Sequence, residues 1–426
     1  MSRIDDALDD LMLSGDLKEW RSSLNIERPV EGVALVAVEL TSACPAVLPE
    51  FSLKWHIPHC NLRHRWYPSL KPDLSLPPDW DGEVSFEMTD FMPLLSLYDG
   101  CGLNRLTFAF SDAGREVRIR AGVVEESAEI DCSVTPCCAS LQKKTSYYAV
   151  LRLDFRPFLY SATVSEAAAW MDEAYGMRRP VSQTAYLPVY STWYAYHQNI
   201  NAAILEEECA VAREYGMSTL IVDDGWQTDD NRRGYAFCGD WEVSMRRLQD
   251  LRAHVEHIHA RGMKFLLWYG LPLEGVNSNA FKRFEGKFLY SRDHGDSWIL
   301  DPRFPDVREY LASLLEQVVL DWNIDGFKLD FIDSFTLSSD YQDSCKTSGC
   351  RDYDAIAPAV DALLKEIGAR CRSLNPGLLI ELRQKYVGAA VRRHGDILRA
   401  ADCPGDVLSN RIRTLELRLC CPGVIF

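Results

Sequence analysis

Charged and large aromatic residues recur along the second half of the chain, each near the end of a short apolar run. Lys328 and Asp330 end "GFKLDF" and lie two residues apart, so on a β-strand they point to the same side. Asp223 and Asp224 follow "STLIV", and Trp268 lies in "KFLLWYG". The lysine favours an ionised Asp330, and two adjacent carboxylates can accept hydrogen bonds from paired sugar hydroxyls. These residues predict a sugar site.

Three further runs carry the same kind of residue. Glu381 and Arg383 end "LLIELR", and Trp193 lies in "YLPVYSTWYAY". Arg399 and Asp402 lie in "ILRAAD". Glycoside cleavage needs two carboxylates that face each other across an oxocarbenium-like centre, one ionised and one protonated. An arginine can orient a carboxylate through two hydrogen bonds. Flat apolar faces for a sugar ring are offered by Trp193, Trp226, Trp268 and Trp298.

The elements that position these residues are strands and helices in alternation. From about residue 186 onward, apolar strand candidates alternate with helices expected near 199–215, 246–261, 306–322, 354–374 and "NRIRTLELRL". Such alternation predicts a parallel sheet that is covered on both faces or closed into a barrel. Seven strands are expected, the last being "VIF" at 424–426, so a (β/α)8 TIM-type barrel would be incomplete at its C-terminus. Active sites of such barrels lie at the C-terminal strand ends. Polar residues at loop starts would explain one or two of these ends, but explain six poorly.

The first part of the chain predicts antiparallel strands. Short, β-branched or alternating runs lie at 33–40, 106–111, 116–124 and 147–155. We expect an N-terminal β-sandwich over residues 1–180, with a connector helix near 165–177 that Ser165 caps. The catalytic barrel is expected over 181–426.

Composition excludes several classes of partner. The formal net charge is −16 without a long basic cluster, so nucleic acid is not an expected ligand. No run reaches the length of a membrane span and the N-terminus lacks a signal-peptide pattern, which predicts a cytoplasmic protein with reduced cysteines. The fourteen cysteines lack paired zinc-site spacing, and the nine histidines form no HxH or HExxH pattern. Neither a metal nor a cofactor is expected.

The ordered motifs resemble glycoside hydrolase family 36, which contains the α-galactosidases (melibiases) and raffinose-synthase relatives. The motifs are "STWYAY", "LIVDDGWQ", "GDWEV", "KFLLWYG", "WILDPRFPDVREYL", "DGFKLDF" and "LRAADCPGDVLSNR". The resemblance covers about 186–426 in order. It implies a retaining hydrolase that cleaves terminal α-D-galactosyl residues from oligosaccharides without a cofactor.

The resemblance also implies roles for individual residues. Asp330 matches the nucleophile, and Asp402 matches the acid/base. Asp223 and Asp224 match the pair that holds the O4 and O6 hydroxyls of galactose. Lys328 matches a ligand of a sugar hydroxyl, and Trp268 and Trp193 match walls of the pocket. Arg383 departs from the family, because many members carry a Cys-Ser-Gly-Gly run at its position.

Several alternatives remain open at this stage. Asp406 lies close enough to Asp402 to be the rival acid/base, and "AADCPGD" also has the composition of a turn. Trp226 suits a core as well as a sugar site. The rival functions are an α-N-acetylgalactosaminidase, a galactosyl transferase of raffinose-synthase type, and an inactive carbohydrate-binding fragment. A homo-oligomer is compatible with the sequence.

Overall fold

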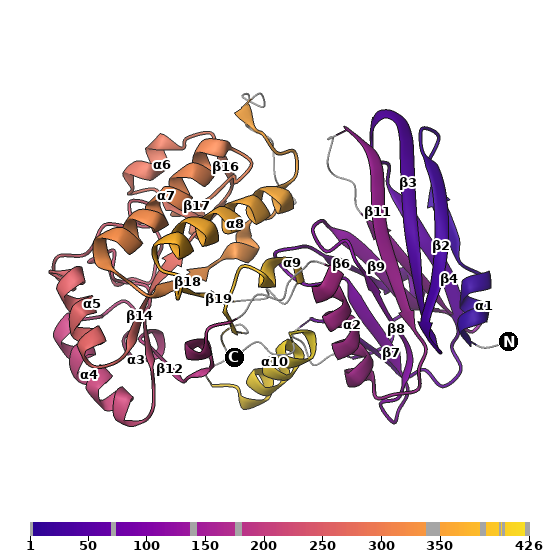
Figure 1. The fold of residues 1–426 in the computed structure, drawn as a ribbon, viewed down its shortest axis with the longest axis horizontal. Helices are drawn as coiled ribbons and strands as arrows, with labels where there is room; N and C mark the ends of the chain where they lie inside the picture. Colours follow the sequence, from indigo (N-terminus) through magenta and orange to yellow (C-terminus); the bar gives the residue numbers. More distant parts are fainter. Residues whose placement is uncertain are drawn as a thin grey trace. The chain divides into compact units, whose positions relative to one another are not determined.

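The computed structural model describes residues 3–69, 74–136, 143–174, 181–337, 350–383, 389–399, 402 and 405–421. These residues form two compact units (Figure 1). The first contains the N-terminal sheets together with helices α9 and α10 from late in the chain, and the second contains the parallel sheet. Each unit has its own core.

The first unit is built from antiparallel strands. Its strands are β1 (Met12–Gly15), β2 (Arg21–Val30), β3 (Val33–Val47), β4 (Phe51–Pro58), β5 (His64–Trp66), β6 (Glu83–Phe86), β7 (Leu94–Tyr98), β8 (Asn104–Phe110), β9 (Val117–Val124), β10 (Glu129–Pro136) and β11 (Lys143–Asp154). Among the described residues they form two sheets, ordered β1-β4-β10-β9-β6 and β2-β3-β11-β8-β7-β5. The two sheets pack against each other. The ring centres of Trp55 on β4 and Phe108 on β8 lie 5.1 Å apart, in an edge-on contact. This is the predicted sandwich.

Helices of the first unit are α1 (Arg3–Asp9), α2 (Tyr160–Ala174), α9 (Ala389–Arg392) and α10 (Val407–Cys420), with a 3-10 turn η1 (Asp79–Asp81). The connector helix α2 begins at Tyr160, so the prediction that Ser165 caps it is wrong. The helix starts earlier because its buried stripe already includes Thr163 and Val164, ahead of Ser165. Helix α10 packs on α2, and Arg392 of α9 pairs with Asp172 of α2.

The second unit contains a parallel sheet in chain order. Its strands are β12 (Val189–Ser191), β13 (Thr219–Val222), β14 (Lys264–Gly270), β18 (Gly326–Asp330), β19 (Leu379–Arg383) and β20 (Ile397–Arg399). The intervening helices are α3 (Trp193–Tyr196), α4 (Ala202–Glu214), α5 (Leu251–Ala260), α7 (Pro305–Trp322) and α8 (Ile356–Leu374) (Figure 1). The predicted strand–helix alternation is therefore present. The expected seventh strand, 424–426, lies outside the described residues.

Two features of the second unit were not predicted. Between β14 and α7 the chain forms a small antiparallel sheet: β15 (Leu273–Gly275), β16 (Phe288–Arg292) and β17 (Ser297–Leu300), with α6 (Asn279–Arg283) and η3 (Asp293–Gly295). The other 3-10 turns are η2 (Gln183–Tyr186) and η4 (Ile332–Ser334). The run "YLPVYSTWYAY" is also only partly a strand, because the chain turns helical at Trp193. Trp193 therefore lies on a helical turn after β12.

The parallel sheet is curled. Buried side chains from strands that are not neighbours meet in one apolar cluster, formed by Ala185, Ile221, Leu266, Leu379 and Ile397. In a flat sheet, β13 and β20 would lie far apart, because adjacent strands are separated by about 4.8 Å. Curling brings these strands around a common interior, as in a TIM-type barrel that is incomplete among the described residues.

Burial along the strands explains why charges can sit inside this sheet. In β4, buried residues alternate with less buried ones, as expected for a strand with one face on the core. In β18 all five residues are buried, including Lys328 and Asp330. A strand covered on both faces gives its polar side chains little access to bulk water. Their charges must therefore be compensated by neighbouring groups.

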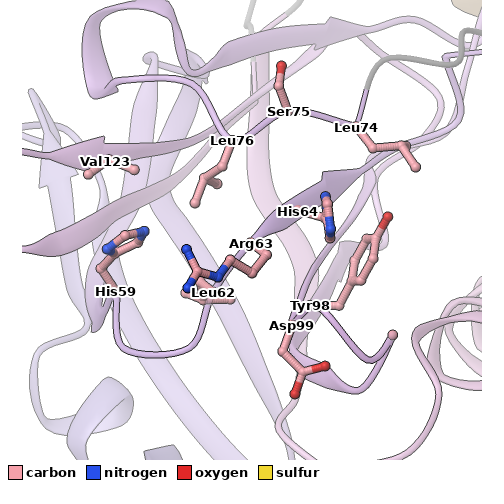
Figure 2. A pocket seen from close by; sticks show the side chains of 12 residues that line it. His59, Leu62, Arg63, His64, Leu74, Ser75, Leu76, Tyr98, Asp99 and Val123 are labelled. Atoms are coloured by element: carbon pink, nitrogen blue, oxygen red, sulfur yellow. The ribbon is translucent and has the colours of Figure 1, made fainter.

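A hollow of about 700 Å³ lies in the first unit (Figure 2). Its polar lining includes His59, Arg63 and Asp99, while Leu76 contributes apolar surface. The Asp99 carboxylate is already engaged, because it accepts hydrogen bonds from two backbone amides and from Arg105. None of the strand-end residues singled out in the sequence lines this hollow.

Asp406 provides a test of local stability. It is the N-cap of α10, where its carboxylate accepts hydrogen bonds from the backbone N–H and the hydroxyl of Ser409. We expect Asp406→Ala to lower the midpoint of thermal unfolding by roughly 2–4 °C, because the first turn of α10 loses its cap. Asp406→Asn, which retains a capping oxygen, is the control and should unfold close to the wild type. Equal midpoints for all three proteins would contradict the capping role.

Candidate active site

The sequence-predicted polar residues lie directly above the apolar cluster of the curled sheet. Strands β13, β14, β19 and β20 each carry a cluster residue and, two positions later on the same side, a polar or aromatic residue. These pairs are Ile221 and Asp223, Leu266 and Trp268, Leu379 and Glu381, and Ile397 and Arg399. In the strand pairing, Trp268 lies beside Lys328, which lies beside Glu381. The strand ends therefore converge on one interior surface.

Asp330 lies at the centre of this surface. Its Oδ2 accepts a hydrogen bond from the indole N–H of Trp268 at 3.0 Å, and its Oδ1 accepts one from Arg383 at 2.7 Å. The backbone N–H of Phe331 donates to Oδ1 at 2.9 Å, and the Lys328 ammonium lies 3.9 Å from Oδ2. Both oxygens are thus held in fixed directions.

These contacts decide the charge of Asp330. The side chain is 3% exposed, and burial by itself would raise its pKa. Lys328 and Arg383 act in the opposite direction, helped by the Trp268 hydrogen bond, and the pKa falls to about 2. Asp330 is therefore a buried carboxylate that stays ionised at neutral pH.

The chain bends sharply immediately after Asp330. Phe331 has φ +63°, which lies in the left-handed backbone region that residues other than glycine rarely adopt. This conformation turns the Phe331 N–H back onto the Asp330 carboxylate. Strained backbone of this kind concentrates at functional sites.

A second group of carboxylates lies next to Asp330. Asp223 pairs with Lys328, and its other oxygen accepts the backbone N–H of Asp224. Asp224 accepts one hydrogen bond from Gln198 and one from Gln227, both at 2.8 Å. Burial raises the pKa of Asp224 to about 6, and the neighbouring Asp223 charge adds to this shift, although both glutamines oppose it.

The glycine of "DDGW" is needed for this arrangement. Gly225 has φ +113°, and a Cβ atom at this position would come within 2.5 Å of the Cα of Gln198. Only glycine allows the backbone to approach Gln198 so closely. This close approach sets the position from which Gln198 reaches Asp224.

Asp402 lies beside Arg383. It accepts a hydrogen bond from the Tyr194 hydroxyl at 2.6 Å, pairs with Arg383, and lies 3.4 Å from Arg399. Burial opposes its ionisation, but the Tyr194 hydrogen bond and the charge of Arg383 lower its pKa. Arg399 is shared with Glu381, whose Oε1 accepts from it at 3.1 Å. Asp402 is about one-third exposed, so it is more accessible than Asp330.

One guanidinium joins the two carboxylates. Arg383 donates through NH1 to Asp330 and through NH2 to Asp402. Burial alone would lower the pKa of Arg383, but these two anions raise it, so the guanidinium keeps its charge. The arrangement supplies two neighbouring carboxylates in different environments, as glycoside cleavage requires.

Most of the sequence-predicted residues meet here, with four exceptions. Trp298 lies on β17 of the small antiparallel sheet, where its ring packs against Phe281 and Phe288. Trp226 is fully buried, donates its N–H to the backbone oxygen of Trp268, and packs against Tyr269. The prediction that it binds substrate is therefore corrected to a core role. Trp193 lies on α3 with its ring against His197, 4.8 Å away. Asp406 caps α10 in the first unit.

Several residues of the site were missed in the sequence. Tyr194 contacts Asp402, and Gln198 and Gln227 hold Asp224. The pKa of Tyr235 is raised mainly by burial, and the nearby charges of Asp224 and Asp330 raise it further. Two of these residues could have been found from their place in the sequence, because Gln227 follows "DDGW" and Tyr194 lies in "STWYAY". Tyr235 carries no comparable signal.

Two other expectations concern metals and membranes. Among the described residues, no group of three or more His, Cys, Asp or Glu side chains is arranged to hold a metal ion. In the same part of the chain, no helix combines the length and apolar character that crossing a membrane requires.

Comparison with known proteins supports the predicted family. Residues 177–357 match the Melibiase family. Alpha-galactosidase 1 of Pediococcus pentosaceus is 27% identical over 151 residues, which is 33% of this chain and 20% of that relative. Alpha-galactosidase Mel36A of Lactobacillus acidophilus is 24% identical over 151 residues, covering 33% of this chain and 19% of Mel36A. The matched part is thus about a fifth of these curated relatives.

Solved structures show the same fold over nearly the whole chain. The α-galactosidase from Lactobacillus brevis has a TM-score of 0.65 at 15% identity, covering 96% of this chain and 63% of its own. The family 36 α-galactosidase AgaA from Geobacillus stearothermophilus, solved in complex with raffinose, has a TM-score of 0.66 at 16% identity. That match covers 94% of this chain and 59% of AgaA. The predicted resemblance and fold class are confirmed.

Because Asp330 is buried and ionised, the difference in unfolding free energy between the wild type and Asp330→Asn should depend on pH. A folded-state pKa of about 2, below the usual 3.8, stabilises the fold at pH values above about 4, and this contribution is lost as the pH falls toward 2. We expect Asp330→Asn to lose about 2 kcal/mol of unfolding free energy at pH 6 relative to the wild type. Urea unfolding followed by tryptophan fluorescence measures this. The difference should shrink toward pH 2, and a difference that is constant with pH would contradict the account.

Proposed function

We propose that this chain, which carries a melibiase domain within the fold of glycoside hydrolase family 36, hydrolyses terminal α-D-galactosyl residues of oligosaccharides with retention of configuration. The observation that carries the proposal is the pairing of Asp330 and Asp402 through one guanidinium at the C-terminal strand ends. A shared guanidinium keeps the two carboxylates close, and retaining enzymes separate them by only about 5–5.5 Å. Inverting enzymes require a wider gap that holds a water molecule.

The relatives support the substrate class. The proteins with the same fold include AgaA structures with bound raffinose and with bound stachyose. Both are oligosaccharides, which fits a site built from buried carboxylates and one ammonium group rather than from an apolar cleft. The proposed substrate is therefore an oligosaccharide with a terminal α-galactosyl group.

In the first step, a carboxylate oxygen of Asp330 attacks the anomeric carbon. The glycosidic C–O bond breaks, and Asp402 donates its proton to the departing oxygen. Asp330 is suited to this attack because it is ionised and oriented by Trp268 and the Phe331 N–H. Asp402 is more exposed than Asp330 and can exchange protons with solvent. Because Tyr194 and Arg383 lower the pKa of Asp402, the protonated form that this step uses is favoured at acidic pH.

In the second step, the roles reverse. Asp402, now ionised, removes a proton from water, and the water oxygen attacks the anomeric carbon of the ester on Asp330. The ester bond breaks, and Asp330 leaves as a carboxylate. Lys328 and Arg383 stabilise the charge that returns to it.

The remaining carboxylates are proposed to hold the galactose ring. Asp223 and Asp224 are buried next to Lys328, where their oxygens can accept hydrogen bonds from two neighbouring sugar hydroxyls. The Lys328 ammonium can donate to a further hydroxyl oxygen. Trp268 shapes the floor behind Asp330, because its N–H is fixed on that carboxylate.

The nucleophile assignment predicts a large loss of activity. Asp330→Ala should lower kcat/KM for p-nitrophenyl α-galactoside by at least about 10³-fold, because the attacking group is removed. Added azide should restore turnover and give a β-galactosyl azide, because the small anion occupies the vacated space. Retention of full activity by Asp330→Ala would contradict the assignment.

The acid/base assignment predicts a dependence on the leaving group. Asp402→Ala should slow raffinose hydrolysis by roughly 10²–10⁴-fold, whereas an activated aryl galactoside, which departs without protonation, should be affected much less in its first step. Asp406→Ala is the matched control, since it removes a nearby aspartate that caps a helix, and both substrates should be cleaved as by the wild type. If Asp406→Ala shows the selective loss instead, the assignment is wrong.

The same assay separates the rival functions. Faster cleavage of p-nitrophenyl α-N-acetylgalactosaminide than of the galactoside would identify an N-acetylgalactosaminidase. Galactosyl transfer to an added sugar in preference to water would identify a transferase. Binding of galactose without turnover of any of these substrates would identify a carbohydrate-binding fragment.

A further inference from the structure

We propose that Arg383 is a positioning residue that serves both carboxylates in turn, holding Asp330 and Asp402 together in the free protein and pairing with Asp402 alone once Asp330 carries the sugar. This inference rests on the proposed retaining hydrolysis and deepens it. It concerns the position at which the chain departs from the Cys-Ser-Gly-Gly run of many family members.

The geometry singles out Arg383 from the other cations of the site. Lys328 lies closest to Asp223 and is 3.9 Å from Asp330. Arg399 forms ion pairs with Glu381 at 3.1 Å and with Asp402 at 3.4 Å. The Arg383 guanidinium, by contrast, donates hydrogen bonds to both Asp330 and Asp402.

Arg383 is also fixed in place rather than free to follow one partner. It is the last residue of β19, and in the pairing of β19 with β20 it lies opposite Arg399. The guanidinium lies 6.0 Å from the ring centre of Phe331, the residue with the left-handed backbone after Asp330. A planar guanidinium with two outward N–H groups can contact two carboxylates without moving its stem.

Charge changes during the reaction give this bridge a function. When Asp402 carries the proton needed for the first step, Asp330 is the anion that holds Arg383. When Asp330 becomes an ester, it loses its charge, and Asp402 becomes the anionic partner of Arg383. A cation that is no longer shared favours the ionised form of Asp402 at the stage at which Asp402 must accept a proton from water. The carboxylate therefore switches from acid to base without a large movement.

Other groups that face the two carboxylates do not provide this switch. The Tyr194 hydroxyl of α3 and Arg399 of β20 face Asp402 in both stages. Lys328 of β18, Trp268 of β14 and Tyr235 face Asp330, together with the Asp223 charge that Lys328 neutralises. Arg292 lies over Phe331 on a ring contact of 4.8 Å and hydrogen-bonds Ser334. Arg383 contacts both carboxylates, so it transmits the loss of charge on Asp330 to Asp402 in addition to the direct repulsion between the two anions.

The test uses pH–rate profiles of the whole chain, with raffinose for kcat/KM, because its leaving group needs the proton of Asp402, and with an activated aryl α-galactoside for kcat. In Arg383→Met, the basic limb of kcat/KM should move to higher pH, because the protonated form of Asp402 in the free protein persists longer. The acid limb of kcat, where hydrolysis of the ester limits turnover, should also move up, by roughly 1–3 pH units. Below that limb the glycosylated protein should accumulate and be visible by intact-protein mass spectrometry.

Three further proteins make the result specific. Arg383→Lys retains one charge but cannot bridge, so its limbs should lie between those of the wild type and Arg383→Met. Guanidinium ions at low concentration should return the limbs of Arg383→Ala toward the wild-type positions. Arg292→Met removes a nearby cation whose ring contact is with Phe331 and whose hydrogen bond is to Ser334, and its limbs should not move.

The outcomes separate this inference from the proposed function. Activity of Arg383→Met or Arg383→Lys that is lowered equally at every pH, with unmoved limbs, would overturn the coupling while leaving the hydrolase intact. If Arg383→Met does not fold, the pH–rate profiles of Arg383→Lys and of Arg383→Ala with added guanidinium are compared instead. Limbs that stay at the wild-type pH in Arg383→Lys and in untreated Arg383→Ala would overturn the coupling. Absence of turnover by the wild-type chain would overturn the proposed function itself.

Discussion

The site depends on keeping one buried carboxylate ionised. Asp330 lies within a strand that is covered on both faces, where an unpaired charge would cost several kcal/mol. The positive charges of Lys328 and Arg383 and the indole N–H of Trp268 offset this cost. Each of these groups is in turn held by another neighbour: Lys328 by Asp223, and Arg383 by Asp402. The network can therefore be disturbed from several strands.

The curled sheet makes such a network possible. Apolar side chains of β13, β14, β19 and β20 close the interior below the site, and the next inward residue on each strand is polar or aromatic. The apolar layer excludes water from beneath the carboxylates, and low polarity there strengthens their interactions with nearby cations. The same two-residue spacing thus builds the core and presents the polar groups.

Much of this could be predicted from the sequence. The alternation of apolar runs with helical stretches predicts the parallel sheet, and the polar residues that end those runs predict where Asp223, Lys328 and Asp330 meet. The alternation in the first part of the chain likewise predicts the sandwich. These features depend on local periodicity, which is visible in one sequence.

Other features depend on contacts between distant segments. Tyr194 reaches Asp402 from a position more than two hundred residues earlier, and no local pattern signals that meeting. Trp226 follows two site aspartates, yet its ring points into the core, because the tight turn at Gly225 reverses the chain there. The inserted sheet between β14 and α7 was missed because it interrupts the strand–helix alternation that runs through the rest of this unit.

The most direct test of the account is to identify the carboxylate that bonds to the sugar. A 5-fluoro-galactosyl fluoride forms the ester but releases it slowly, so the modified protein can be digested and its peptides sequenced by mass spectrometry. The account predicts a single galactosyl adduct on Asp330, within the segment Gly326–Phe331. An adduct on Asp402 or on any other carboxylate, in a chain that hydrolyses α-galactosides, would contradict it.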